Sequence, residues 1–286
     1  MSLGIMKTAA KSRVLSFVLL LVLLLGAVPI ARAAAPPAAK HATVELISEH
    51  EAILSGKRFW IGLRFQLDPS WHIYWKNPGD SGTPPRAQWN LPPGFSAGEL
   101  GWPAPVRLGK APIVDYGYEG QVLLILPVTP SAALKPGSTV TLGAKLKWVV
   151  CQDICIADEA VVKLSLPVAE TSREQASPWQ KLFAVTRTRL PQPAPRNWRI
   201  RALAGKNEFT LLLETGVRPR EATLFPLEEG QIDNAAPQEV APLPRGVKIT
   251  LKQSDQLLKP ISVLKGVLVL SSGRAYQIAA PVSPGK

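Results

Sequence analysis

Short runs of alternating apolar and polar residues recur through most of the chain. Between residues 140 and 150, apolar side chains fall at every second position, with Lys145 and Lys147 between them. A period of two is typical of β-strands that bury one face. The same period, or a short apolar run, predicts further strands at residues 42–48, 59–67, 122–128, 162–168, 198–202, 209–213, 247–251, 263–269 and 276–278.

Proline punctuates these runs and favours an all-β fold. It accounts for 28 of the 286 residues, about twice its usual share. The chain is also longer than a typical single domain, so we predict two β-sandwich domains. We place the first at residues 36–170 and a second, smaller one at residues 196–286.

The stretch between the two predicted domains has a helical period. Ser177 and Pro178 are typical of an N-cap followed by the first helical residue. Apolar residues then recur at helical spacing up to about Arg189, and the segment Leu190–Pro195 reads LPQPAP. We therefore predict a short helix and a stiff Pro-rich linker within residues 171–195.

The N-terminus has the features of a secretory signal peptide. Basic residues precede the apolar segment Val14–Leu25, and small residues follow it up to Ala35. This order predicts a signal peptide over residues 1–35, cleaved near Ala33 or Ala35, with an uncleaved membrane anchor as the alternative. No cysteine directly follows the apolar segment, so we do not expect a lipoprotein anchor. The exported protein is expected to be soluble.

The chain is basic, and its basic residues are scattered along the sequence. The 33 Lys and Arg residues outnumber the 21 Asp and Glu residues, for a net charge of +12. No block of basic residues and no basic stripe interleaved with aromatic residues is present. We therefore expect no nucleic-acid partner.

The chemistry of the chain is concentrated in its two cysteines, Cys151 and Cys155. If the strand alternation continues, Cys151 has the parity of Lys147 and Cys155 that of Lys163, so both would point away from the core and be accessible. A straight strand would hold them roughly 13 Å apart, whereas a disulfide needs Cα atoms within about 7 Å. The chain is therefore expected to turn between them or to be locally helical.

Three interpretations of the cysteine pair remain open, and a redox-exchanging dithiol is favoured over the others. A disulfide that closes so small a ring contributes only about 2 kcal/mol, which makes it a poor structural staple. A purely structural disulfide and a copper(I) site on two thiolates are the alternatives. The chain has only three histidines and no Gly-x-Ser-x-Gly motif, so we expect neither a hydrolase nor a zinc site, and no cofactor.

Two aromatic segments precede the cysteines, and we predict that both are loops. The first, Asp68–Pro85, contains Trp71, Tyr74 and Trp75 before a Gly/Pro-rich stretch, and a packing role is favoured over a recognition surface. The second, Val114–Gly120, reads VDYGYEG and leads into a strand, so its polar and aromatic side chains are placed to reach a neighbouring turn.

Several segments resemble the N-terminal periplasmic region of the DsbD/ScsB thiol:disulfide interchange proteins. The cysteine segment Trp148–Val168 reads WVVCQDICIADEAVVKLSLPV and is the most specific of them, together with WKNPGDSG at Trp75–Gly82. Further blocks of the ScsB-like branch are similar to DYGYEGQVLLILPV at Asp115–Val128 and LFPLEEGQIDNAAPQ at Leu224–Gln238. The similarity covers nearly all of the chain after the predicted signal peptide.

The resemblance implies an immunoglobulin-like β-sandwich and a redox role for Cys151 and Cys155. Electrons would pass from a separate membrane electron transporter or a thioredoxin-like donor to periplasmic disulfide proteins. Thioredoxin-like or disulfide isomerase-like proteins are then the expected partners, in the periplasm and without a small-molecule substrate. In the family a cap covers the cysteines, and here Asp115, Tyr116 and Tyr118 fall at that place.

Two departures from the family pattern limit the expected function. The cysteine spacing is shorter than in the best-known DsbD proteins, and the chain stops before the membrane domain and the thioredoxin-like domain. We therefore expect a component of protein-disulfide reduction rather than a complete electron relay. The alternative is a copper(I)-binding or protein-interaction module with a structural disulfide.

Two local expectations follow from the charges and from the second domain. Asp153, Asp158 and Glu159 lie near the cysteines and disfavour a thiolate, with only Lys147 opposing them, so no strongly activated thiol is expected. Residues 196–286 contain no Cys or His, so we expect this domain to be a scaffold and docking element.

Overall fold

The fold is described from a computed structural model, which covers residues 40–170 and 175–285. The predicted signal peptide, residues 1–35, lies outside the described residues, as do residues 171–174 of the predicted linker. Among the residues described, no helix is long and apolar enough to cross a membrane.

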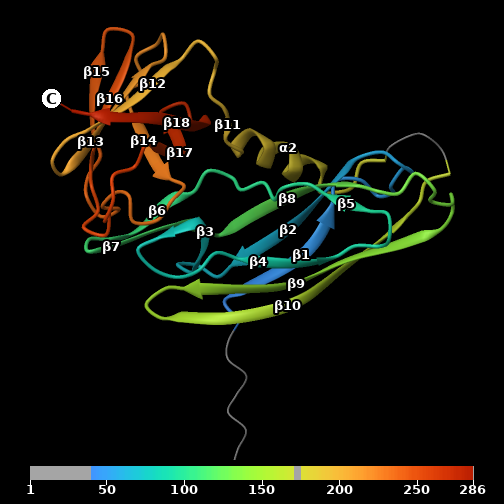
Figure 1. Ribbon diagram of the computed structural model, residues 1–286. Helices are drawn as coiled ribbons and strands as arrows, with labels where there is room; N and C mark the ends of the chain where they lie inside the picture. Colours follow the sequence, from blue (N-terminus) through green and yellow to red (C-terminus); the bar gives the residue numbers. More distant parts are fainter. Residues whose placement is uncertain (1–39, 171–174, 286) are drawn as a thin grey trace, which may run out of the picture. The chain divides into compact units, whose positions relative to one another are not determined.

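Two sheets form the N-terminal β-sandwich (Figure 1). The first sheet has the strand order β1-β2-β8-β5 and consists of β1 (Ala42–Ser48), β2 (Phe59–Leu67), β8 (Gln121–Thr129) and β5 (Ser96–Ala97). The second sheet has the order β10-β9-β3-β7-β6, with β4 also paired to β9. Its strands are β10 (Cys155–Pro167), β9 (Thr139–Cys151), β3 (His72–Gly79), β7 (Ile113–Glu119), β6 (Val106–Lys110) and β4 (Arg86–Asn90).

The alternating residues of these strands form one apolar core between the two sheets. Phe65 and Trp148 meet edge to face inside it, with ring centroids 5.6 Å apart. The alternate apolar positions of β9 from Leu142 to Val150 are buried, while Lys145 and Lys147 between them are exposed. The alternation thus places β1, β2, β8, β9 and β10 and their inward faces as predicted, and the all-β fold class is confirmed.

The prediction of two aromatic loops is wrong, because both segments contain strands. His72–Gly79 is β3 and Ile113–Glu119 is β7, and the two pair antiparallel with a register shift between Tyr74 and Gly79. Gly117 allows this pairing, since a Cβ there would lie 2.2 Å from the Ile73 carbonyl oxygen. The expected packing role is confirmed for Trp71, Tyr74 and Trp75, all of which are buried.

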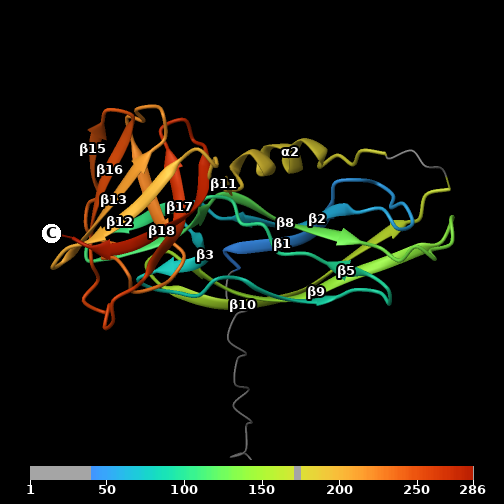
Figure 2. The same cartoon turned by 45° about the horizontal axis from the view of Figure 1, so that its top comes forward.

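A helix and a short strand connect the sandwich to the second half of the chain. Helix α2 (Gln180–Arg189) begins two residues later than Ser177 and Pro178 suggested, although the Ser177 hydroxyl still accepts a hydrogen bond from the Trp179 N–H. The helix lies beside β8 (Figure 2), and the buried Phe183 packs on Ile47, Leu123 and Ile125. The Pro-rich linker contains β11 (Gln192–Pro193), which pairs in parallel with β18.

The strands predicted after the linker form a third sheet of eight strands. Its order is β14-β17-β18-β12-β13-β16-β15, with β11 paired to β18, and it curls into a nearly closed barrel. The members not yet bounded are β12 (Arg199–Ala204), β13 (Glu208–Glu214), β14 (Ala222–Pro226), β15 (Glu239–Leu243), β16 (Gly246–Lys252), β17 (Val263–Leu270) and β18 (Ala275–Pro284). We call residues 196–285 the C-terminal barrel.

The C-terminal barrel has an apolar core of its own but is not isolated from the sandwich. Leu211, Ile249 and Leu268 are fully buried inside the barrel. Phe225, Val267 and Ala275, however, belong to the same buried cluster as the sandwich core. The division into domains at residues 170 and 196 stays a prediction.

The packing of α2 yields a stability prediction. Replacing Phe183 by Ala removes a fully buried ring from the contact between α2 and β8. We expect the free energy of unfolding to fall by about 3–5 kcal/mol, measured by urea denaturation. Val185→Ala on the same helix is the control, because Val185 is 49% exposed and its loss is expected to change stability by less than about 0.5 kcal/mol. Equal effects of the two substitutions would contradict this packing.

Candidate functional site

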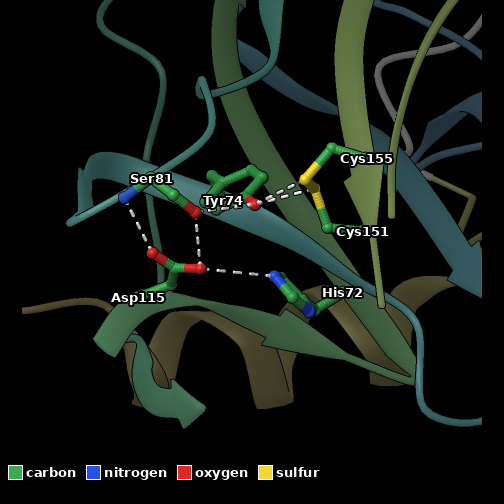
Figure 3. Close-up of a disulfide and its surroundings, with 6 residues drawn as sticks. All are labelled: His72, Tyr74, Ser81, Asp115, Cys151 and Cys155. Atoms are coloured by element: carbon green, nitrogen blue, oxygen red, sulfur yellow. Dashed lines mark hydrogen bonds and ion pairs between the residues drawn. A yellow bond between two sulfur atoms is a disulfide. The ribbon is translucent and has the colours of Figure 1, made fainter. Parts of the chain in front are cut away.

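A tight hairpin brings the two cysteines together. Cys151 ends β9 and Cys155 begins β10, and the two are directly paired in register. Their Cα atoms are 4.2 Å apart and their sulfur atoms form a disulfide. The Gln152 N–H donates to the Ile154 carbonyl and closes the three-residue loop between them. The predicted turn is therefore confirmed, and the disulfide links the two strands of the hairpin next to this turn (Figure 3).

The two sulfur atoms are in different environments. Cys155 is exposed, as its parity predicted, whereas Cys151 is only 1% exposed. The prediction that Cys151 is accessible is therefore wrong. Cys151 is not a member of the sandwich core, and neither is the fully buried Tyr74. Both lie on the outer face of the sheet, which is covered at this end by other residues.

Tyr74 makes the direct contact with the disulfide. Its hydroxyl donates a hydrogen bond to Cys151 Sγ at 2.7 Å and lies 3.5 Å from Cys155 Sγ. The strand pairing explains this contact, because His72 of β3 is opposite Cys151 and Tyr74 follows on the same face. Burial raises the pKa of Tyr74, with a further increase from Asp115 that Ser81 opposes, so the hydroxyl stays protonated and able to donate.

A polar network continues from Tyr74 to Asp115 (Figure 3). The Tyr74 hydroxyl is 3.4 Å from Ser81 Oγ, and Ser81 donates from both its N–H and its hydroxyl to the Asp115 carboxylate at 2.9 Å. On the other side, His72 Nε2 is 3.8 Å from Asp115 Oδ2. Burial lowers the pKa of His72, although Asp115 and Glu119 act in the opposite direction. The imidazole is therefore neutral at pH 7.

Residues 80–82 cover Tyr74 from the solvent side, and we call them the cover segment. Gly82 has a φ of +71°, and a Cβ at this position would lie 2.0 Å from the Tyr74 ring. Only glycine allows the backbone to approach the ring so closely in this conformation. Ser81 Oγ lies 3.4 Å from the Tyr74 hydroxyl, so the cover segment reaches both the ring and the hydroxyl of Tyr74.

The three residues predicted to cap the cysteines are placed differently from one another. Asp115 is joined to the disulfide through Ser81 and Tyr74. The Tyr116 hydroxyl instead donates to Asn234 of the C-terminal barrel, and the Tyr118 hydroxyl donates to the Pro103 carbonyl. All three are buried within strand β7 rather than exposed on a loop.

Charged residues near the hairpin are mostly paired. Glu159 lies 3.7 Å from Lys145 and 3.9 Å from Lys147, and Asp158 lies 3.8 Å from Lys40. These ion pairs offset part of the negative charge that was expected to disfavour a thiolate. A groove of about 520 Å³ lies over the hairpin and is lined by Thr83, Pro84, Arg86, Lys147, Trp148, Val149, Ala157, Asp158 and Glu159.

The arrangement suits thiol chemistry. An exposed sulfur permits attack by an incoming thiolate, and a hydroxyl donor stabilises the sulfur that leaves. Within residues 40–170 and 175–285, no group of three or more His, Cys, Asp or Glu side chains is placed to hold a metal ion.

A match to a known protein family includes the cysteine hairpin. Residues 43–167 match the family of the N-terminal domain of the thiol:disulfide interchange protein DsbD. This range spans the sandwich from β1 to the end of β10. The N-terminal sandwich thus resembles a DsbD N-terminal domain. The resemblance noted from the sequence is thereby confirmed for this part of the chain.

A solved structure shows the same fold over a longer range than the DsbD N-terminal domain alone. The crystal structure of the N-terminal periplasmic domain of ScsB from Proteus mirabilis aligns with a TM-score of 0.64 and 18% identity. The alignment covers 88% of this chain and 97% of that chain, so it includes the C-terminal barrel. At this identity the likeness establishes the fold.

Other matches are much weaker. The periplasmic chaperone SfaE aligns with a TM-score of 0.22 and 11% identity over 84% of this chain and 100% of its own. The chaperone DraB of E. coli gives 0.23 and 10% over 84% and 97%. No curated protein sequence matches the chain significantly.

Sequence reasoning missed three residues of the site in the N-terminal sandwich. His72, Tyr74 and Ser81 all lie in the first aromatic segment, which was taken for a loop. Alternation within HIYWK was an available signal, because Ile73 and Trp75 face the core and therefore direct His72 and Tyr74 to the other face.

The contact between Tyr74 and Cys151 predicts a kinetic effect. Tyr74→Phe removes the hydroxyl and keeps the ring against Gly82. When a thiolate attacks Cys155, charge develops on the departing Cys151 sulfur, and hydrogen bonds to charged groups contribute about 1.5–3 kcal/mol. We expect the rate at which dithiothreitol reduces the disulfide to fall by about tenfold, measured at fixed pH by trapping thiols with time.

The matched control is Tyr276→Phe. Tyr276 is a half-buried tyrosine of the C-terminal barrel that packs on Trp198 with ring centroids 4.6 Å apart. Its substitution is expected to leave the reduction rate unchanged. A Tyr74→Phe protein that is reduced as fast as the unmodified protein would show that the hydroxyl does not stabilise the leaving sulfur.

Proposed function

We propose that this chain is a periplasmic thiol:disulfide exchange module that acts through Cys151 and Cys155. It passes electrons from a membrane electron transporter or a thioredoxin-like donor to periplasmic disulfide proteins. The observation that carries the proposal is the asymmetry of the pair within a sandwich that resembles a DsbD N-terminal domain. Cys155 is exposed to a partner, while Cys151 is buried against the Tyr74 hydroxyl.

Reduction of the disulfide begins at the exposed sulfur. A donor thiolate attacks Cys155 Sγ, a mixed disulfide forms, and the bond to Cys151 breaks. Cys151 leaves as a thiolate that the Tyr74 hydroxyl stabilises. The second thiol of the donor then attacks the donor sulfur of the mixed disulfide and releases Cys155. Two electrons and two protons have then passed to the pair, and the donor is left as a disulfide.

Delivery to an acceptor runs through the same sulfur. The Cys155 thiolate attacks the acceptor disulfide and forms a mixed disulfide, with one acceptor sulfur leaving as a thiolate. Cys151 then attacks Cys155 Sγ, which re-forms the intramolecular disulfide and releases the reduced acceptor. Cys155 is therefore the partner-facing cysteine in both directions, and Cys151 is the resolving cysteine.

The proposed cap consists of the cover segment and strand β7 behind it. Asp115 acts through its two hydrogen bonds to Ser81, which keep Ser81 near the Tyr74 hydroxyl. Tyr116 and Tyr118 support β7 from within the fold rather than touching the sulfurs. Ile154, 64% exposed in the loop beside Cys155, offers an apolar contact to the partner.

Trapping of a mixed disulfide tests the proposal. Cys151→Ser leaves the exposed Cys155 without its resolving partner. We expect this variant, once reduced, to form a stable, dithiothreitol-sensitive complex with an oxidised thioredoxin-fold protein, seen by non-reducing electrophoresis. Cys155→Ser is the matched control and is expected to react at least about tenfold more slowly, because Cys151 is buried. Absence of any complex with Cys151→Ser would overturn the proposed exchange.

A stability measurement distinguishes an exchanging pair from a structural disulfide. The disulfide closes a ring of a few residues at the end of a hairpin that is already paired along 13 residues of β9. We expect the Cys151→Ser/Cys155→Ser double variant to lose about 2 kcal/mol or less of unfolding free energy in urea. A loss of more than about 4 kcal/mol would identify the disulfide as a structural element.

A further inference from the structure

The C-terminal barrel contacts the cover segment through one buried side chain, Asn234. Its Nδ2 donates to Asp80 Oδ1 at 2.8 Å, and its Oδ1 accepts a hydrogen bond from the Tyr116 hydroxyl at 2.8 Å. Asn234 is 7% exposed. A buried amide that uses both ends in this way has a defined orientation, and breaking either bond leaves a polar group without its partner.

Asp80 transmits this contact to the cover segment, of which it is the first residue. Its second carboxylate oxygen accepts from the Val114 N–H at 2.8 Å, and its own N–H donates to the Val114 carbonyl at 3.2 Å. The next residue, Ser81, is held by Asp115. Gly82 then lies against the Tyr74 ring. The path from the barrel to Cys151 is therefore a continuous series of contacts.

A second set of contacts fixes the chain just before the cover segment. Asn77 is 1% exposed, and its Nδ2 donates to the carbonyls of Pro226 at 2.9 Å and Glu228 at 3.4 Å. Its Oδ1 accepts from the Gly79 N–H at 3.0 Å. The segment that crosses the site thus has polar anchors to the barrel at two points, Asn77 and Asp80.

Apolar packing surrounds these polar anchors. The Phe225 ring of the barrel lies edge to face against Tyr116 at 5.1 Å and against Trp75 at 6.3 Å, measured between ring centroids. Phe225 is 4% exposed and belongs to the core cluster of the sandwich. Arg107 of β6 also donates to the carbonyls of Asn234 and Ala236. Asn234 is therefore buried on the side of the sandwich, while its partner Asp80 is exposed.

We propose that Asn234 is a positioning residue for the redox site. Through Asp80, the C-terminal barrel holds the cover segment against Tyr74 and so keeps Cys151 buried and bonded to the Tyr74 hydroxyl. The inference rests on the proposed exchange function and deepens it, because it makes the barrel part of the redox site. It replaces the expectation that the barrel is a scaffold and docking element only.

The accessibility of Cys151 gives a direct readout of this role. In a Cys155→Ser background, Cys151 is the only thiol, and its rate of alkylation by iodoacetamide reports opening of the cover segment. Asn234→Ala removes both side-chain hydrogen bonds. Since each hydrogen bond contributes roughly 0.5–1.5 kcal/mol net, we expect alkylation to accelerate by about two- to tenfold.

Gln238→Ala is the matched control. The Gln238 side chain also bonds at both ends, to the N–H and the carbonyl of Leu224 at 2.8 Å, but entirely within the barrel. Its loss is expected to lower the thermal unfolding midpoint without changing Cys151 alkylation. If both variants accelerate alkylation equally, general loosening explains the effect and the positioning role is overturned.

A rescue variant excludes misfolding as the cause. Asn234→Asp places a second carboxylate against Asp80, and we expect it to accelerate alkylation more than Asn234→Ala. The double variant Asp80→Asn/Asn234→Asp exchanges the two groups and keeps the number of charges unchanged. The amide introduced at position 80 can donate to the new carboxylate and accept from Val114, while Tyr116 keeps its acceptor. We expect alkylation to return to within about twofold of the unmodified rate.

The outcomes separate this inference from the exchange function. Faster alkylation in Asn234→Ala, with rescue by the exchanged pair, supports the positioning role even if no partner complex is trapped by Cys151→Ser. Unchanged alkylation in both Asn234→Ala and Asn234→Asp overturns the positioning role even if the complex is trapped.

Discussion

The contact between the Tyr74 hydroxyl and Cys151 Sγ makes the two cysteines inequivalent. The hairpin alone places both sulfurs on the outer face of the sheet, in directly paired positions. Cys151, which accepts the Tyr74 hydrogen bond, is only 1% exposed, whereas Cys155 is exposed. A disulfide that is reached at one sulfur only has a defined order of bond breaking, because the incoming thiolate meets Cys155 and Cys151 leaves. The proposed chemistry therefore depends on this one hydrogen bond and on what holds it.

The rest of the structure serves to hold the contact in place. Strand β3 carries Tyr74 beside β9, and Gly117 of β7 lets the two strands approach closely enough to pair. Asp115 and Asp80 anchor Ser81 and the chain before it to β7. The C-terminal barrel adds Asn234 and the carbonyls that Asn77 reaches, around the Phe225 ring. Buried polar groups with several partners of this kind give one defined arrangement, which suits a site that must keep one sulfur covered.

Alternation predicted most of the fold, including β1 and β2 with the bounds that the structure shows, because each of these strands buries one face. It also predicted the turn between the cysteines and the exposure of Cys155. It failed for β3 and β7, where the outward face carries Tyr74 and Asp115 and is buried as well, so that the polar and apolar positions no longer differ in burial. Tyr74, which contacts Cys151, lies 77 positions before it in the chain. The local alternation of apolar and polar residues does not predict contacts over such a distance. The four segments that carried the family resemblance contain Ser81, Asp115, Cys151 and Asn234, which Tyr74 and Asp80 join into one network.

The reduction potential of the Cys151–Cys155 pair tests the central claim most directly. It is measured by equilibrating the protein with dithiothreitol or glutathione buffers of known potential and quantifying the alkylated thiols. Structural disulfides typically have potentials below about −300 mV, whereas exchanging pairs lie above that value. The asymmetric, partly exposed pair is predicted to have a potential above about −300 mV. A value below this limit would contradict the account and identify the disulfide as structural.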